Sequence, residues 1–419
     1  MTYSEKMLDA LDQEDFAKAQ TQLKQAMKHD DEDILEELGE SLLSIGFLQE
    51  AQQVFESLKT RHPEKKEMNL PLAEIAVENN ETDAALELLE EIESTSELYP
   101  QALLITADLY QVLGIPEVSE AKLKEASRIL PDEPLIQFAL AELYLTMDRL
   151  SEAEFIYQHL LEIGEEEINN VSIKERLGTT LSLEGKFEEA IEYLEASLEE
   201  GQTDERLFQT AFVYRQLEDN DKAIYYLQEL RKLNPQYHAL YLPLAESLQE
   251  EELVEEAQTV IEEGIHDNPY QVDLYHFASA NSYRLHDANK SEKFLLQALE
   301  LGEKTDETLL KLSDLYLNEE RFEEAIQMVN QMEDAQNPYA LWNLAQAYNE
   351  LEEFKQASNF YDQASVELKH EPDFMKEYGI FLREEGRLEE AKSYLSHYLE
   401  HEPGDMEAAS ILEDLSESW

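Results

Sequence analysis

Small side chains return along this chain at intervals close to 34 residues, with apolar side chains at constant distances from them. Each repeat has an Ala or Ser that is followed, four residues later, by an apolar residue, as in Ala223 and Leu227. Twelve residues earlier stands a second small residue, such as Ala211, in every repeat except the first. Residues four apart share a helix face, and helices approach closely where side chains lack bulk. The pattern therefore predicts about twelve stacked helical hairpins, each with one small residue on either helix.

The small residues define the register of the predicted hairpins. The later position of each repeat holds Ala19, Ala51, Ala85, Ser119, Ala153, Ala190, Ala223, Ala257, Ser291, Ala325, Ala357 and Ala391. The earlier position holds Gly39, Ala73, Ala107, Ala141, Gly178, Ala211, Ala245, Ser279, Ser313, Ala345 and Gly379.

Proline and glycine mark the predicted helix ends. Proline cannot continue a helix, and it recurs where the second helix should end, at Pro63, Pro131, Pro235, Pro269 and Pro403. We expect an atypical N-terminal repeat over residues 1–31, a solenoid of repeats over 32–405 and a capping region over 406–419. The capping helix should run from Met406 to about Leu415. The repeat is longer at residues 164–170, which predicts either a bend between the first five and the last seven repeats or a longer loop.

Two repeats match a known pattern especially well. They read LWNLAQAYNELEEFKQASNFYDQA from Leu341 and YGIFLREEGRLEEAKSYLSHYL from Tyr378. These two repeats show the pattern most clearly, and across its whole length the chain resembles the tetratricopeptide-repeat (TPR) family. Its strong acidity also makes it similar to the YpiA-type all-repeat proteins of low-GC Gram-positive bacteria. The resemblance implies an all-α fold, an α-α superhelix of about twelve hairpins. It also implies a role in protein–protein interaction, with the first helix of each repeat lining a concave groove.

Composition and charge narrow the function classes. Only 12 Gly and 12 Pro occur in 419 residues, which suits a chain that is mostly helix interior. The net charge of −63 argues against binding to nucleic acid or to anionic membrane surfaces, because both require clustered Lys and Arg. The same charge favours protein or peptide partners that have a basic segment.

Catalytic, metal and targeting signals are missing from the pattern. There is no cysteine, no glycine-rich phosphate loop and no nucleophile or zinc-binding motif, so we expect neither an enzyme nor a cofactor. His397 and His401 stand four residues apart, which suits either a metal site or two histidines in the last turn of a helix. No apolar stretch resembles a signal peptide or a membrane span, which predicts a cytoplasmic protein.

The repeat register predicts which side chains line the groove. These side chains belong to the residues three positions before, one position after, and four or five positions after the earlier small residue of each repeat. In the first four full repeats these positions include an acidic set interleaved with Leu70, Leu104 and Phe138. The acidic groove residues are Glu36, Glu40, Glu74, Asp108 and Glu142.

From the sixth repeat the predicted groove changes character toward aromatic, Arg and amide side chains, which are typical of binding hot spots. This partner-binding set is Phe208, Phe212, Arg215, His276, Tyr283, Arg284, Trp342, Asn343, Gln346 and Asn349, with Glu246 and Asp314 interrupting it. Asn343 matches the family position at which an Asn often bonds the backbone of a bound peptide. For Phe208, Phe212 and Trp342 the alternative is packing between neighbouring helices.

The groove positions favour a non-catalytic scaffold or adaptor that binds a peptide or helix of a partner protein. The family's cationic clamp for a C-terminal carboxylate needs Lys and Arg, whereas the first repeats have Glu and Asp at those positions. Two alternatives remain open. One is a regulator that occludes a basic enzyme or DNA-binding partner, and the other is a self-assembling structural protein.

Overall fold

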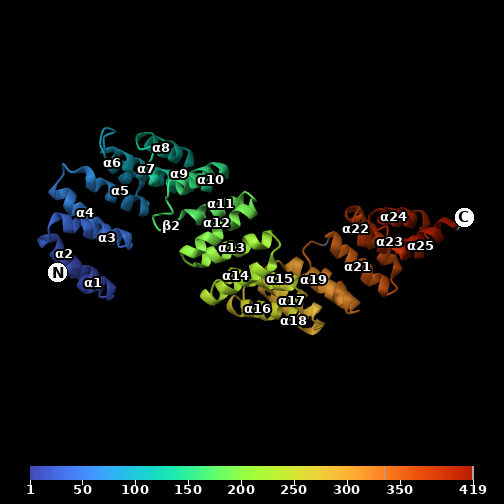
Figure 1. Cartoon of the computed structure of the whole chain (residues 1–419). Coiled ribbons are helices and arrows are strands. Elements are labelled where there is room, and N and C mark those ends of the chain that lie inside the picture. The colour runs from blue at the N-terminus through green and yellow to red at the C-terminus, as the bar shows by residue number, and fades with distance from the viewer. Residues whose placement is uncertain (335, 418–419) are drawn as a thin grey trace. The chain divides into compact units, whose positions relative to one another are not determined.

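The structure of the chain is a computed structural model that describes residues 1–334 and 336–417 (Figure 1). Consecutive α-helices pack in pairs within each part of the chain, α1 against α2 and so on to α11 against α12, then α15 against α16 and so on to α23 against α24, and α25 packs against α24. The described residues therefore form the all-α helical-repeat fold that the small-residue pattern predicts. The chain divides into two compact units: unit 1 is Met1–Leu217, and unit 2 begins at Glu218.

Unit 1 contains six and a half helix pairs and a short β-hairpin. Its helices are α1 (Tyr3–Asp12), α2 (Phe16–His29), α3 (Glu32–Ser44), α4 (Leu48–Arg61), the 3-10 helix η1 (Lys66–Met68), α5 (Asn69–Glu78), α6 (Thr82–Glu90), α7 (Tyr99–Val112), α8 (Pro116–Ile129), α9 (Pro134–Thr146), α10 (Leu150–Glu162), α11 (Ile173–Leu183), α12 (Phe187–Glu200) and α13 (Asp204–Gln216). Its strands are β1 (Glu167–Ile168) and β2 (Val171–Ser172).

Unit 2 continues the pairing and ends on the single helix α25. Its helices are α14 (Asn220–Leu233), the 3-10 helix η2 (His238–Leu240), α15 (Tyr241–Glu250), α16 (Val254–Asp267), α17 (Val272–Arg284), α18 (Ala288–Leu301), α19 (Thr305–Asn318), α20 (Phe322–Val329), α21 (Pro338–Glu350), α22 (Phe354–Leu368), α23 (Pro372–Glu384), α24 (Leu388–His401) and α25 (Met406–Glu417).

The small residues lie where the two helices of a hairpin touch. A Cβ atom added at Gly39 would come within 2.6 Å of the Phe55 ring. In α17 and α18 the two small residues hydrogen-bond directly, with the hydroxyl oxygens of Ser279 and Ser291 2.8 Å apart. All twelve later small residues are at most 2% exposed. A larger side chain at these positions would force the helices of a hairpin apart.

Each hairpin turns through one residue with a left-handed backbone. In the second hairpin this is Gly46 (φ 81°), and the amide of Phe47 donates to the carbonyl of Leu42 at 2.8 Å. Such a bond closes the end of the first helix and satisfies one of its last carbonyls. Gly114, Gly185 and Gly386 occupy the same turn in three other hairpins.

The insertion at residues 164–170 is not simply a loop, because it contains strand β1, which pairs with β2 just after it, and these are the only two strands among the described residues. Strands β1 and β2 pair antiparallel, with Ile168 opposite Val171, and Asn169 and Asn170 make the turn between them. This hairpin lies within unit 1, and whether it also acts as a bend stays a prediction. At the other end of the chain, α25 covers α24 with Ala408 and Leu415, which join the last apolar cluster.

Candidate interaction grooves in the two units

Unit 1 has a groove of about 880 Å³. Its walls come from α3, the segment of η1 and α5, α7 and α9, the odd-numbered helices that follow one another in Figure 1. All five acidic residues that the repeat register places in the groove line it: Glu36, Glu40, Glu74, Asp108 and Glu142. Leu70, Leu104 and Phe138 line it as well, so carboxylates and apolar side chains share one surface.

Four of these five carboxylates have no ion pair with any described residue. They are Glu36, Glu40, Glu74 and Asp108, and the one polar side-chain contact among them is Gln111 Nε2 at 3.5 Å from Asp108 Oδ1. Glu142 differs, because Arg176 Nε lies 3.0 Å from its Oε1 and the Tyr157 hydroxyl donates to the same oxygen. The unpaired negative charge of the groove is therefore concentrated on α3, α5 and α7.

The groove perturbs the acidity of its carboxyls. Burial by the surrounding walls, together with the charge of Glu78, raises the pKa of Asp108 to about 6. Burial and the charge of Asp108 also raise the pKa of Glu74, and burial and Glu40 raise that of Glu36. The side chains of Glu74 and Asp108 are themselves accessible to solvent. They are thus surrounded by protein on several sides while still open to a ligand, as side chains on the floor of a groove should be.

The aromatic and Arg residues predicted on α13 lie outside this groove. Phe208, Phe212 and Arg215 are not among its lining residues. Phe212 is 41% exposed, whereas Phe208 and Arg215 are half-buried and each interact with neighbouring side chains. These three residues therefore form no common site with the acidic groove.

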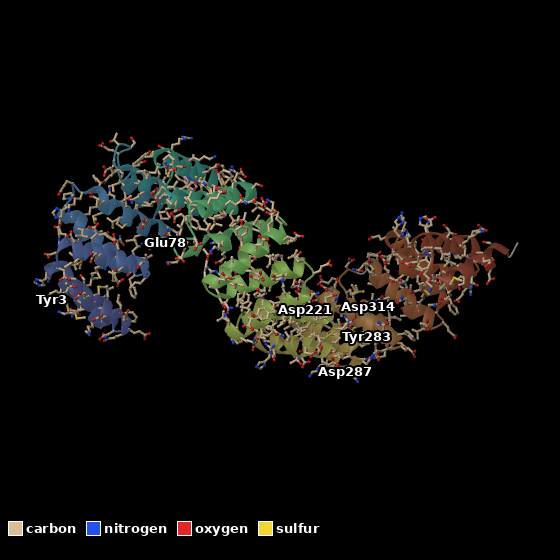
Figure 2. The ribbon with its side chains drawn as sticks, viewed as in Figure 1. Tyr3, Glu78, Asp221, Tyr283, Asp287 and Asp314 are labelled. Carbon is tan, nitrogen blue, oxygen red and sulfur yellow. The ribbon has the colours of Figure 1, made fainter. Side chains whose placement is uncertain are left out.

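In unit 2, two of the predicted residues meet at a small cavity of about 190 Å³. His276 and Tyr283 on α17 line it together with Asp314 on α19, and Tyr283 and Asp314 are labelled in Figure 2. His276 is buried, its Nε2 lies 2.8 Å from Thr308 Oγ1, and burial lowers its pKa. Arg284 is exposed outside the cavity, with Nη2 3.6 Å from Glu252 Oε2.

The predicted residues on α21 are largely engaged within unit 2. Trp342 Nε1 donates to Glu377 Oε1 at 3.0 Å, and Gln346 Nε2 donates to Glu377 Oε2 at 2.6 Å. The Trp342 ring also meets Phe374 edge-on, with centroids 5.5 Å apart. Asn343 is only 6% exposed, and its Nδ2 donates to Asp314 Oδ1 at 2.6 Å. Three of the four side chains predicted to hold a ligand thus already hold neighbouring helices.

A larger groove of about 620 Å³ in unit 2 contains the fourth of them, Asn349. Gln346 and Asn318 line it too, and Glu377 lies on its wall. The Tyr361 hydroxyl is a third donor to Glu377, and burial raises the pKa of that carboxyl. Glu377 is a central residue of this region that the sequence did not reveal, because nothing in the repeat pattern separates it from the other acidic residues.

Metal sites and membrane-spanning helices are both absent from the described residues. No cluster of three or more His, Asp or Glu side chains within residues 1–334 and 336–417 could hold a metal ion. The ring of His397 lies beside that of His370, with centroids 6.3 Å apart. In the same part of the chain, none of the helices combines the length and the apolar composition needed to cross a bilayer.

The geometry of paired helices and repeat grooves has counterparts in known proteins. The family described as YpiA-like tetratricopeptide repeats matches residues 111–165, and YpiA-like C-terminal tetratricopeptide repeats match residues 338–405. The TPR repeat-containing protein YpiA of Bacillus subtilis (strain 168) is 34% identical over 357 residues, which cover 85% of this chain and 84% of that protein. The chain belongs to the YpiA-type TPR family. Proteins with such repeats are generally non-catalytic scaffolds for protein interactions.

A solved structure agrees with a TPR fold for this YpiA-type chain. The C-terminal part of a TPR repeat-containing protein from Cytophaga hutchinsonii has a TM-score of 0.50 at 15% identity, covering 58% of this chain and 99% of that one. The Cut9 and Hcn1 hetero-tetramer of the APC/C has a TM-score of 0.44 at 14% identity, covering 98% and 95%. At 15% identity, the likeness to the Cytophaga hutchinsonii protein concerns the fold alone.

Proposed function

We propose that the groove of unit 1 binds a segment of another protein in which basic side chains alternate with apolar ones. The observation behind this proposal is that Glu36, Glu40, Glu74 and Asp108 face one groove without an ion pair among the described residues. The scaffold role of repeat proteins in this family supports a protein as the partner. The acidic and apolar lining of the groove supports a segment with basic and apolar side chains.

Charge and apolar area would act together in such binding. The raised pKa values of Glu74 and Asp108 indicate that burial, and after it the neighbouring acids, disfavour their charged forms. Lys or Arg side chains would relieve this repulsion, speed association and exclude acidic competitors. Apolar side chains of the segment would rest mainly on Leu104, because Leu70 and Phe138 are each only 8% exposed, and would add roughly 1.5–3 kcal/mol each if they became fully buried.

In unit 2 the proposal is narrower than the sequence pattern suggested. Trp342, Asn343 and Gln346 could contact a ligand only by exchanging their present partners, Glu377 and Asp314. Asn349 and Tyr283 have side chains at the surface of the two cavities and are the residues we propose for ligand contact there.

The proposal for unit 1 can be tested with random 16-residue peptides displayed on phage and selected on the full chain. We expect enriched peptides to alternate Lys or Arg with Leu, Ile or Phe, and to lose affinity as salt rises. The double variant Glu74→Gln with Asp108→Asn should weaken the selected peptides at least tenfold.

A matched control removes the same two charges outside the groove. Glu37→Gln with Glu87→Gln changes exposed residues of α3 and α6 that do not line the groove, and should alter affinity less than twofold. Enrichment of neutral or acidic peptides, or equal effects of the two double variants, would overturn the proposal.

A further inference from the structure

The β-hairpin of unit 1 is an insertion into the repeat that reaches the groove. Its two-residue turn consists of Asn169 and Asn170, both with left-handed backbones (φ 51° and 62°). Two such residues in sequence are typical of a tight turn whose twist matches that of the paired strands. The turn is therefore a defined structure in which the direction of each Asn side chain is set by the strands.

Several contacts hold this hairpin in place. Ile168 is 8% exposed and belongs to the same apolar cluster as Phe138 of α9 and Ile173 of α11. At the base of the hairpin, Lys174 Nζ lies 3.3 Å from Glu166 Oε1 and 2.9 Å from a Glu200 carboxylate oxygen. The hydroxyl of Ser172 accepts from the Glu175 amide and caps α11. An apolar anchor, ion pairs and a helix cap together keep the turn at a constant position.

The two turn residues differ in their relation to the groove. Asn169 lines it, as do Phe138 and Glu142 of α9, whereas Asn170 does not. Neither side-chain amide has a hydrogen bond within the part of the chain that the structure describes. Asn169 therefore offers one donor and one acceptor to whatever occupies this end of the groove.

Charge changes along the groove toward the hairpin. The unpaired carboxylates lie on α3, α5 and α7, and Glu142, the acid nearest the hairpin, is already paired with Arg176. None of the described lining residues comes from α11, the next odd-numbered helix. The hairpin thus lies where both the negative charge and the lining of the groove end.

We propose that the hairpin closes this end of the groove and that the Asn169 amide hydrogen-bonds the backbone of a neutral end of the bound segment, whose basic residues lie over α3, α5 and α7. This inference rests on the function proposed above. It adds the orientation of the bound segment in the groove, with its neutral end at the hairpin. Because the backbone of the turn is held in place, ordering it costs little entropy on binding, and hydrogen bonds to the Asn169 amide favour a segment that ends at the hairpin.

The test compares glycine substitutions at the two turn positions, since glycine accepts a left-handed backbone and preserves the turn. A peptide selected on the wild-type chain is the probe. Asn169→Gly should weaken its binding about five- to tenfold, the loss expected for one or two neutral hydrogen bonds. Asn170→Gly removes the same side chain from the same turn but away from the groove, and should leave the dissociation constant unchanged.

Asn169→Asp distinguishes a neutral ligand end from a basic one. It keeps the size of the side chain but replaces the amide by a carboxylate, so a neutral end should bind no better to it than to wild type. Tighter binding to this variant would place a basic end at the hairpin and overturn the inference, as would equal affinity of the two glycine variants.

Failure of this inference is separable from failure of the proposed function. If Glu74→Gln with Asp108→Asn weakens the peptide while Asn169→Gly and Asn170→Gly do not, the acidic groove binds and the hairpin has no part in it. If the charge variant itself has no effect, the groove proposal fails first.

Discussion

In unit 1, Glu74 and Asp108 face a groove without an ion pair, whereas in unit 2, Asp314 and Glu377 border grooves while accepting hydrogen bonds from neighbouring helices. Glu40, Glu74, Asp108 and Asp314 occupy the same place in the repeat, one residue after the first small residue. Whether such an acid is free for a ligand is therefore not a property of its place in the repeat.

The neighbouring repeat makes the difference. On α5 and α7 the acids meet other acids, so burial and repulsion raise their pKa values, and the one side-chain donor within reach is Gln111 Nε2, 3.5 Å from Asp108 Oδ1. On α21 the neighbouring residues are Asn343, Gln346 and Trp342, which donate to carboxylates of α19 and α23. Hydrogen bonds to a carboxylate are strong, so a donor within reach binds the acid in the folded chain. Carboxylates beside other carboxylates therefore remain open to a ligand, whereas carboxylates beside amides are already hydrogen-bonded.

Trp342 gives the strongest test of this difference between the units. If the groove side chains of unit 2 mainly hold helices together, Trp342→Ala should cost about 2–4 kcal/mol of local stability, because it removes a ring contact and a hydrogen bond. Amide hydrogen exchange over α21 to α24 measures this loss. Tyr339→Ala, at an exposed residue of the same helix, is the matched control and should cost less than about 1 kcal/mol. Unchanged exchange in Trp342→Ala would show that Trp342 does not hold these helices together and would favour a role in ligand binding instead.

The next variants ask whether the two units differ only in their grooves. Ala85 on α6 and Ala345 on α21 are both fully buried at helix crossings. Leu at either position should overpack its hairpin and cost about 1–3 kcal/mol, with faster amide exchange first in the adjacent helices. Ala84 is exposed beside Ala85, so Ala84→Leu controls for the added side chain. A cost at one site and none at the other would show that the packing, too, differs between the units.

The smallest effect concerns the pH dependence of unit 1. The pKa of Asp108 is about 6 in the folded chain and 3.8 for the ordinary group, so folding favours its protonated form. This contribution to stability is present below about pH 4 and is lost as the pH rises through 6. Since solvent reaches the carboxylate, we expect on the order of 1 kcal/mol, seen as stronger protection of α5 and α7 at pH 5 than at pH 7 after the exchange rates are corrected for the pH dependence of the base-catalysed intrinsic rate. Asp108→Asn should remove the difference, and persistence of the full effect would assign it to another group.

Much of the acidic groove is predictable from the repeat register. Helical periodicity and the 34-residue spacing place Glu36, Glu74 and Asp108 on the same side of the first helix in three successive repeats. All three residues line one groove. The same register could not show that Asn343 reaches Asp314, because that contact depends on how two successive hairpins are set against each other. The residues 164–170 stood out only by their length, and the position of Asn169 at the groove depends on Ile168 packing beside α9.

The amino-acid sequence is sufficient to specify the hairpins, their register and the sign of the charge in the first groove. Each of these follows from local rules: helix periodicity, the need for small residues at close crossings, and the residue types at fixed positions. Which groove side chains remain free is settled at the tertiary level, because hydrogen bonds between successive repeats join residues about 30 positions apart. Pairs such as Asn343 with Asp314, or Trp342 with Glu377, form only when backbone packing brings them within bonding distance, and no single-repeat pattern contains that distance.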